Sequence, residues 1–205
     1  MATRLKLHWS PKSPYVRKVM ICAHELGLQD RLELVRSVAA MLKPNPAIMA
    51  DNPLSKIPTL VLDDGTALFD SSVICQYLNE LAQGSLIAAT GPARWQALRW
   101  EAFGDGLLDV LILWRNERER EHPMQVLTDA FELKTRAALK RLESEVQSLD
   151  AATFDLGHVS ICCALGYLDY RFDALGWRKE APGLARWYAD MQKRPSVRST
   201  EPADG

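Results

Sequence analysis

The chain has 205 residues, of which 25 are Lys or Arg and 26 are Asp or Glu, so its formal net charge is −1. This balance excludes a strong field that would draw the protein to nucleic acid or to a membrane surface. No run of about 18 apolar residues occurs, and the first residues lack the apolar region of a signal peptide. We therefore expect a cytosolic protein with small molecules or proteins as partners.

The first third of the chain alternates strand and helix patterns. Residues 5–9 predict a strand, and residues 14–26 carry apolar side chains at helical spacing until Gly27. Residues 32–35 predict a second strand, which a right-handed crossover places parallel to the first. After a loop with three prolines, 59–62 and 67–69 predict an antiparallel hairpin around Asp63-Asp64-Gly65, and a helix follows at 73–81.

Two points in this hairpin region indicate a ligand. Proline has no N–H, so Pro58 at the start of a strand leaves the N–H and C=O of Ile57 free to pair with a bound peptide. Asp70 and Ser71 stand where a helix begins, and unpaired N–H groups and hydroxyls at such a place can hold a carboxylate.

The second half of the chain is predicted to be helical. Long amphipathic patterns cover 93–119, 126–149, 157–172 and 182–193. The fold class is therefore an α/β N-terminal domain of βαβ-ββα order plus an all-α helical bundle. We assign residues 1–80 to the first domain, 81–92 to a linker and 93–205 to the second domain.

Ser10-Pro11-Lys12-Ser13 lies between the first strand and the first helix. A thioredoxin-like fold carries C-P-x-C there, and with serines at both positions a dithiol couple is absent. A helix N-terminus and a serine hydroxyl still favour a thiolate, and thiols of ordinary pKa about 8.5 reach about 3.5 to 7.5 at such helix ends. An S-x-x-S pattern alone is an ordinary helix start, but together with Pro58 and Ser71 it predicts a site for a small thiol peptide.

The four cysteines lie inside apolar helical patterns and lack the spacing of metal ligands or of C-x-x-C. We expect buried, reduced thiols at Cys22, Cys75, Cys162 and Cys163. The four histidines form no ligand cluster either. We expect no metal and no cofactor.

These segments resemble the soluble glutathione transferase family, whose N-terminal domain is thioredoxin-like and whose C-terminal domain is helical. Residues 10–19 look like the S-P-x-S-P-Y-V-R-K-V motif of a bacterial branch of that family, and 52–58 look like its N-P-x-G-K-V-P, with Ser55 in place of the glycine. Residues 70 and 71 match its acidic-Ser pair. In the helical half, 104–109, 166–171 and 198–202 look like segments of the same branch.

The resemblance implies glutathione as co-substrate. Ser13 would be the activating hydroxyl and Ser10 a structural one, although family branches place the hydroxyl differently and Ser10 stays the alternative. Tyr15, a possible activator of another type, is interpreted as a helix residue. The resemblance further implies that Ile57 pairs with the cysteinyl backbone of glutathione, that Pro58 follows a cis bond, and that Asp70 and Ser71 hold the γ-glutamyl group.

Other residues have two interpretations each. Lys43 and Lys56 can meet the glycyl carboxylate of glutathione or lie in solvent. Four residues can line a pocket for the second substrate or pack in the core, namely Trp9, Phe103, Trp114 and Arg115. The family's helix-capping box, Ser or Thr followed by Asp, is here Asp155 and His158, and we expect His158 to replace the return hydrogen bond poorly.

The sequence therefore predicts a glutathione transferase that adds the glutathione thiolate to a hydrophobic electrophilic small molecule, and a homodimer. A second hypothesis is a non-catalytic glutathione-binding or scaffold protein on the same fold. A third is a glutaredoxin-like reductase, against which the paired serines argue. Isomerase, peroxidase and dehalogenase variants of glutathione chemistry stay open.

Overall fold

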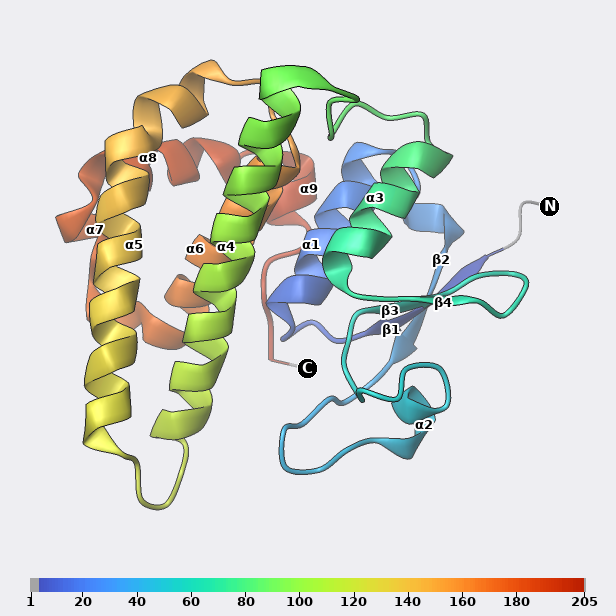
Figure 1. The fold of residues 1–205 in the computed structure, drawn as a ribbon, viewed down its shortest axis with the longest axis horizontal. Coiled ribbons are helices and arrows are strands. Elements are labelled where there is room, and N and C mark those ends of the chain that lie inside the picture. Colours follow the sequence, from blue (N-terminus) through green and yellow to red (C-terminus); the bar gives the residue numbers. More distant parts are fainter. Residues whose placement is uncertain (1–3, 205) are drawn as a thin grey trace.

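The computed structural model describes residues 4–204, which form a sheet half and a helical half (Figure 1). The strands are β1 Leu5–Trp9, β2 Leu32–Arg36, β3 Thr59–Val61 and β4 Ala67–Leu68. They lie in the order β2-β1-β3-β4. β1 pairs with β2 in parallel, whereas β1 with β3 and β3 with β4 pair antiparallel. The predicted βαβ unit followed by a hairpin is confirmed.

Two helices pack on the sheet. α1 (Pro14–Glu25) begins after Ser13 and α3 (Ser71–Leu81) begins after Asp70, and the two helices contact each other (Figure 1). Their apolar faces join the inward side chains of the sheet in one core, which includes Leu5, Leu7, Val19, Ile21, Leu60, Ile74 and Leu78. Burial of these side chains fixes α1 and α3 against β1 and β3.

The loop with three prolines contains a short helix that the sequence reasoning missed. α2 (Pro46–Met49) begins after Asn45, whose Oδ1 accepts a hydrogen bond from Ala47 N at 3.0 Å. Asn is a favoured N-cap and proline is favoured at the first helical position, so the Asn45-Pro46 pair is the signal for this helix. A 3₁₀ turn also precedes β2 at Gln29–Arg31.

From Gly91 onward, every regular element of the described residues is a helix. They are α4 Gly91–Arg118, α5 Gln125–Ala151, α6 Leu156–Phe172, a 3₁₀ turn at Asp173–Leu175, α7 Trp177–Glu180, α8 Pro182–Met191 and α9 Pro195–Arg198. None of the helices within residues 4–204 is long and apolar enough to span a membrane.

α6 lies at the centre of the helical half, with 14 of its 17 residues buried. α4 crosses it closely at Gly104, where a Cβ atom would come within 2.6 Å of the Ser160 carbonyl carbon. Only a glycine permits that approach.

The four cysteines are buried and free, as predicted, and burial raises the pKa of the Cys163 thiol to about 12.

The segment between α3 and α4 is packed against the protein. Leu86 and Ile87 are each only 8% exposed. Leu86 N donates to Asn79 Oδ1 at 3.0 Å, and Leu86 O accepts from Leu156 N at 2.9 Å. These bonds fix the connection between the two halves.

The expectation that His158 replaces the capping-box hydrogen bond poorly is wrong. Asp155 Oδ1 accepts from His158 N at 3.1 Å, and His158 Nδ1 lies 3.3 Å from Asp155 N and 2.7 Å from Asp155 Oδ1. The neutral imidazole closes the box as an acceptor, and the protonated one pairs with the Asp155 carboxylate. His158 Nε2 also lies 3.0 Å from Leu149 O, so the buried ring bonds at both nitrogens.

Candidate functional site

Ser13 lies at the start of α1, directly after the loop that leaves β1. Its backbone is extended, and its hydroxyl oxygen accepts a hydrogen bond from Val16 N at 3.3 Å. A hydroxyl that accepts in this way still has its proton to donate. The first N–H groups of α1 and the positive end of its dipole lie at the same place. This end of α1 can therefore stabilise an anion.

Ser10 is held by other groups. Its Oγ accepts from Arg36 Nη1 at 3.0 Å and from Lys12 N at 3.4 Å. These contacts connect the β1–α1 loop to the end of β2, which is consistent with a structural role for Ser10.

Tyr15 is a residue of α1, as predicted. Its hydroxyl donates to the Asp109 carboxylate, and Asp105 O lies 3.5 Å away. Burial and the bond to Asp109 raise the pKa of Tyr15 above its ordinary value. Because the Tyr15 hydroxyl already donates its hydrogen bond to Asp109, Tyr15 is a poor candidate for an activator of a thiol.

Ile57 and Pro58 are joined by a cis peptide bond, immediately before β3. Within residues 4–204, the Ile57 main-chain N and O make no hydrogen bond to another protein group. The free main-chain groups that the sequence predicts at this position are therefore present. They can pair with an extended peptide as a further strand would.

The loop before Pro58 is supported by Asn52, which is fully buried. Its Nδ2 donates to Thr59 Oγ1 at 3.0 Å and to Lys56 O at 3.3 Å. Ser55 has a φ of 52°, in the left-handed region where glycine is favoured. Its Oγ accepts from Asn45 N at 2.8 Å, a bond that a glycine could not make.

Asp70 and Ser71 stand at the start of α3. Asp70 is exposed, and its Oδ1 accepts from Ser72 N at 3.0 Å, so it caps the helix. Ser71 is only 2% exposed. The Phe69–Asp70 peptide bond is cis. A carboxylate bound here would meet the N–H groups of the first turn, and a bound ammonium would meet Asp70.

The strand register brings these three places to the same end of the sheet. His8 of β1 lies opposite Thr59 of β3, so the residues after His8 reach the same end as Ile57 and Pro58. Leu60 lies opposite Leu68 of β4, so the chain that continues to Asp70 also arrives at this end. The end of β1, the start of β3 and the start of α3 therefore meet, and the β1–α1 loop with Ser13 begins there.

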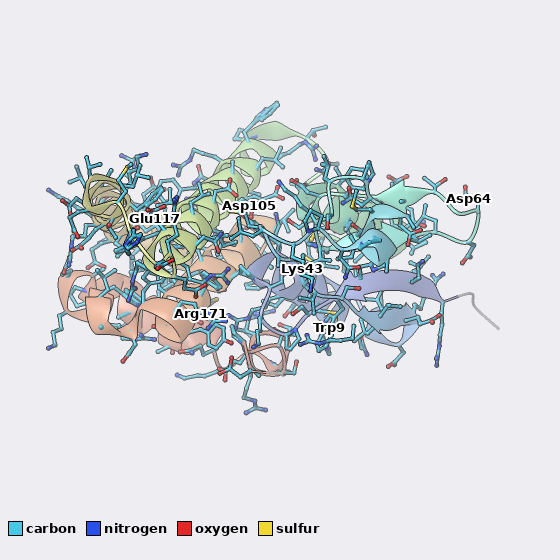
Figure 2. All side chains as sticks on the ribbon, turned by 90° about the horizontal axis from the view of Figure 1, so that it is seen from below. Trp9, Lys43, Asp64, Asp105, Glu117 and Arg171 are labelled. Carbon is cyan, nitrogen blue, oxygen red and sulfur yellow. The ribbon has the colours of Figure 1, made fainter. Side chains whose placement is uncertain are left out.

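The two candidate lysines, Lys43 and Lys56, are both exposed. Figure 2 shows Lys43 in the sheet half, where Trp9 also lies at the end of β1. Trp9 is half-buried, and the guanidinium of Arg36 lies 5.7 Å from its ring centroid.

The other candidates for a second-substrate pocket lie on α4 and differ in burial. Trp114 is 5% exposed, with its ring 4.6 Å from that of Phe172, so the structure places it in the core. Phe103 and Arg115 are half-buried. Arg115 Nη1 donates to Tyr167 OH at 3.3 Å.

A buried charge cluster anchors α1 to the helical half, and sequence reasoning missed it. Lys18 is fully buried, and its Nζ lies 2.7 Å from Glu101 Oε1 and 2.6 Å from Asp105 Oδ2. Asp105 Oδ1 accepts from Ser160 Oγ at 2.6 Å. Burial alone would lower the pKa of Lys18, but Cys75 and the two carboxylates raise it above its ordinary value. The cluster fixes α1, and with it Ser13, against α4 and α6.

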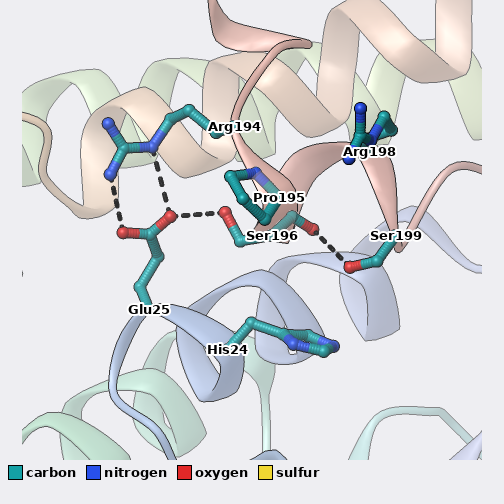
Figure 3. A pocket seen from close by; sticks show the side chains of 7 residues that line it. All are labelled: His24, Glu25, Arg194, Pro195, Ser196, Arg198 and Ser199. Carbon is teal, nitrogen blue, oxygen red and sulfur yellow. Dashed lines mark hydrogen bonds and ion pairs between the residues drawn. The ribbon is translucent and has the colours of Figure 1, made fainter.

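Two cavities lie near the opposite end of α1. One, of about 520 Å³, is lined by His24, Glu25 and residues 194–196, 198 and 199 (Figure 3). The other shares Glu25 and Arg194 with the first. Because a 12-residue helix is about 18 Å long, the length of α1 separates the two cavities from Ser13.

Between residues 4 and 204, no group of His, Cys, Asp and Glu side chains is arranged to hold a metal ion.

Known proteins resemble this chain in sequence and in fold. The family model of the glutathione S-transferase N-terminal domain matches residues 12–81, and that of the C-terminal domain matches residues 125–190. A glutathione transferase family member from Pseudomonas fluorescens Pf-5, solved with bound glutathione, is 42% identical with a TM-score of 0.92, over 98% of this chain and 100% of that one. The chain belongs to the glutathione S-transferase family.

One further structure and two curated proteins are also similar to this chain. A second structure of the Pseudomonas transferase, 41% identical, contains S-(propanoic acid)-glutathione. The GST-like protein YibF of Escherichia coli (strain K12), described as uncharacterised, is 28% identical over 97% of this chain and 98% of its own. Elongation factor 1-gamma of Danio rerio is 27% identical over 76% of this chain, which spans 36% of that protein.

Proposed function

We propose that this family member is an active glutathione transferase that binds reduced glutathione at the end of the sheet where β1 finishes and β3 begins. The observation that carries the proposal is the convergence of three elements, namely the start of α1, the free main chain of Ile57 and the start of α3. Their order suits an extended thiol peptide with its sulfur at Ser13. The glutathione bound by the Pseudomonas relative supports glutathione as the ligand.

In the proposed reaction, the glutathione thiol first loses its proton to solvent. The Ser13 hydroxyl donates a hydrogen bond to the thiolate, and the N-terminus of α1 lowers the thiol pKa from its ordinary value of about 8.5. The thiolate then forms a C–S bond with an electrophilic carbon. In a substitution, the bond to the leaving group breaks and that group departs with the electron pair; in an addition, the π electron pair of the activated double bond shifts to the neighbouring atom, which takes a proton from solvent. Positioning and charge stabilisation supply the acceleration.

The rest of the peptide has partners of matching chemistry. Ile57 pairs with the cysteinyl main chain, Ser71 and the first turn of α3 bind the γ-glutamyl carboxylate, and Asp70 faces its ammonium. Lys43 or Lys56 meets the glycyl carboxylate, since both lysines are exposed. For the second substrate we propose Trp9, Phe103 and Arg115, and we leave out Trp114 because it is in the core.

Replacing Ser71 by alanine is expected to weaken glutathione binding about tenfold, because a bond to a charged carboxylate is lost. Titration calorimetry of glutathione into the variant measures this directly. Ser72→Ala is the matched control, since Ser72 is the next residue and its Oγ accepts only a long bond from Gln76, at 3.4 Å. Unchanged affinity in Ser71→Ala rules out the carboxylate site at α3.

We also infer a homodimer, as the family resemblance implies. Large apolar side chains are exposed on α3 and α4, with Val73 at 44%, Leu81 at 36% and Trp95 at 70%, and pairing would cover such surface. Sedimentation equilibrium should give twice the chain mass of 23.0 kDa. A monomer mass at every concentration contradicts the inference.

The similarity to elongation factor 1-gamma, whose name states no transferase activity, favours one second candidate, a binding or scaffold protein on this fold. Activity decides between the two. A transferase turns over at least one electrophile of a broad panel with glutathione, whereas a scaffold protein turns over none.

A further inference from the structure

Lys12 and Tyr170 bond to the C-terminal segment beside the start of α1, and Arg171 lies against the Tyr170 ring. Lys12 precedes Ser13 in the β1–α1 loop, and Tyr170 and Arg171 lie in the last turn of α6. Figure 1 shows the C-terminal segment passing the start of α1, and Figure 2 shows Arg171 on the helical half of the molecule. We call Lys12, Tyr170 and Arg171 the basic cluster.

The basic cluster holds one carboxylate of the chain itself. Lys12 Nζ lies 3.4 Å from Asp204 Oδ1, and the Tyr170 hydroxyl donates to the same oxygen. The bond from Tyr170, followed by Lys12 and Arg171, lowers the pKa of Asp204 below its ordinary value. A single carboxylate oxygen is thus recognised by a hydroxyl and by positive charge, as a bound anion would be.

The cluster has more positive charge than Asp204 neutralises. The guanidinium of Arg171 lies 3.9 Å from the Tyr170 ring centroid. Its Nε is buried without a hydrogen bond, and no carboxylate pairs with Arg171 in the described part of the chain. Arg171 therefore adds a second positive charge beside the pair of Lys12 and Asp204, and Lys12 directly precedes the residue that we propose to hold the thiolate.

Asp204 is held loosely. Its side chain is 76% exposed and that of Lys12 is 41% exposed, and exposed ion pairs contribute little to stability. The carboxylate of a bound small molecule can replace that of Asp204 with little loss of free energy. It would accept the same hydrogen bond from Tyr170 and lie beside the same positive charges of Lys12 and Arg171.

We propose that the basic cluster binds the carboxylate of an acidic electrophile, and that Asp204 occupies this subsite until such a substrate arrives. The inference rests on the proposed transferase function and narrows its substrate class to small electrophiles that carry a carboxylate. Lys12, Tyr170 and Arg171 are specificity residues in this account, and Asp204 is an internal competitor.

A suitable probe is 4-chloro-3-nitrobenzoate with its uncharged analogue 4-chloro-3-nitrobenzamide. In either reaction the glutathione sulfur forms a bond to the ring carbon that carries chlorine, the C–Cl bond breaks, and chloride leaves with the electron pair. The thiol proton goes to solvent. The two S-aryl conjugates differ only in carboxylate against amide, and they can be made without the enzyme.

The test measures the Kd of both conjugates and of glutathione by titration calorimetry with the whole chain. We expect the carboxylate conjugate to bind about tenfold more tightly than the amide conjugate. Lys12→Gln and Arg171→Gln should each reduce this preference to about twofold. Asp204→Asn should tighten the carboxylate conjugate about threefold and leave the amide conjugate unchanged.

The matched controls are Lys193→Gln and Asp190→Asn, since Lys193 Nζ and Asp190 Oδ1 form an exposed pair of 2.6 Å elsewhere. Equal affinity for the two conjugates overturns the subsite while leaving glutathione binding intact. If Lys12→Gln weakens glutathione as much as the carboxylate conjugate, the cluster binds a carboxylate of glutathione itself and the inference is wrong. If glutathione does not bind at all, the proposed function fails first.

Discussion

Ser13→Ala is expected to lower kcat about a hundredfold, because it removes the hydrogen bond that stabilises the developing charge on sulfur. Affinity for glutathione should stay within about twofold, since Ser13 contacts the reacting atom and not the groups that hold the peptide. Steady-state kinetics on any electrophile that the wild type turns over, together with calorimetry, measures both quantities. The thiol pKa in the bound complex should rise in parallel.

Ser10→Ala is the matched control. Its Oγ is bound by Arg36 and by Lys12 N, so its loss should loosen the β1–α1 loop and change kcat by only a few-fold. Tyr15→Phe should also keep most activity, because the Tyr15 hydroxyl donates to Asp109. If Ser10→Ala shows the large loss and Ser13→Ala does not, the assignment of the activating hydroxyl is wrong.

Lys18→Met is expected to destabilise the protein by about 3 kcal/mol, because it leaves Glu101 and Asp105 facing each other without their shared cation. For a chain of this length, each 1 kcal/mol corresponds to roughly 2–4 °C in Tm, so Tm should fall by about 10 °C. Circular dichroism during heating measures the change. Since the cluster connects α1 to α4 and α6, the remaining folded protein should also bind glutathione less tightly.

Lys193→Met is the control that distinguishes the loss of the buried charge cluster from the general effect of replacing a lysine. Lys193 pairs with Asp190, but both side chains are more than half exposed, so its replacement should change Tm by about 2 °C or less. A Tm in Lys18→Met that equals the value in Lys193→Met contradicts the anchoring role of the buried cluster.

Sequence patterns alone predict the sheet half closely. The strand and helix signals at 5–9, 14–26 and 32–35 fall within one residue of β1, α1 and β2, because apolar periodicity and caps are local properties. The capping role of Asp70 also follows from local chemistry, whereas the cis bond before Pro58 follows from the family resemblance alone.

Long-range contacts are what sequence patterns could not give. Lys18 of α1 meets Glu101 and Asp105 of α4 only in the folded chain, and no pattern in either segment connects them. Asp204 and Lys12 are nearly the whole chain apart, and no periodicity connects them. His158 differs from the family's carboxylate in the capping box, yet its ring keeps the bond because Leu149 and Asp155 hold both nitrogens.

The most direct test of the account is a pH titration of thiolate absorbance for glutathione bound to the wild-type protein. A thiol stabilised by Ser13 and the N-terminus of α1 should ionise with a pKa below about 7.5, against about 8.5 for an ordinary thiol. An unshifted pKa in a complex that does form, or no complex at millimolar glutathione, contradicts the account.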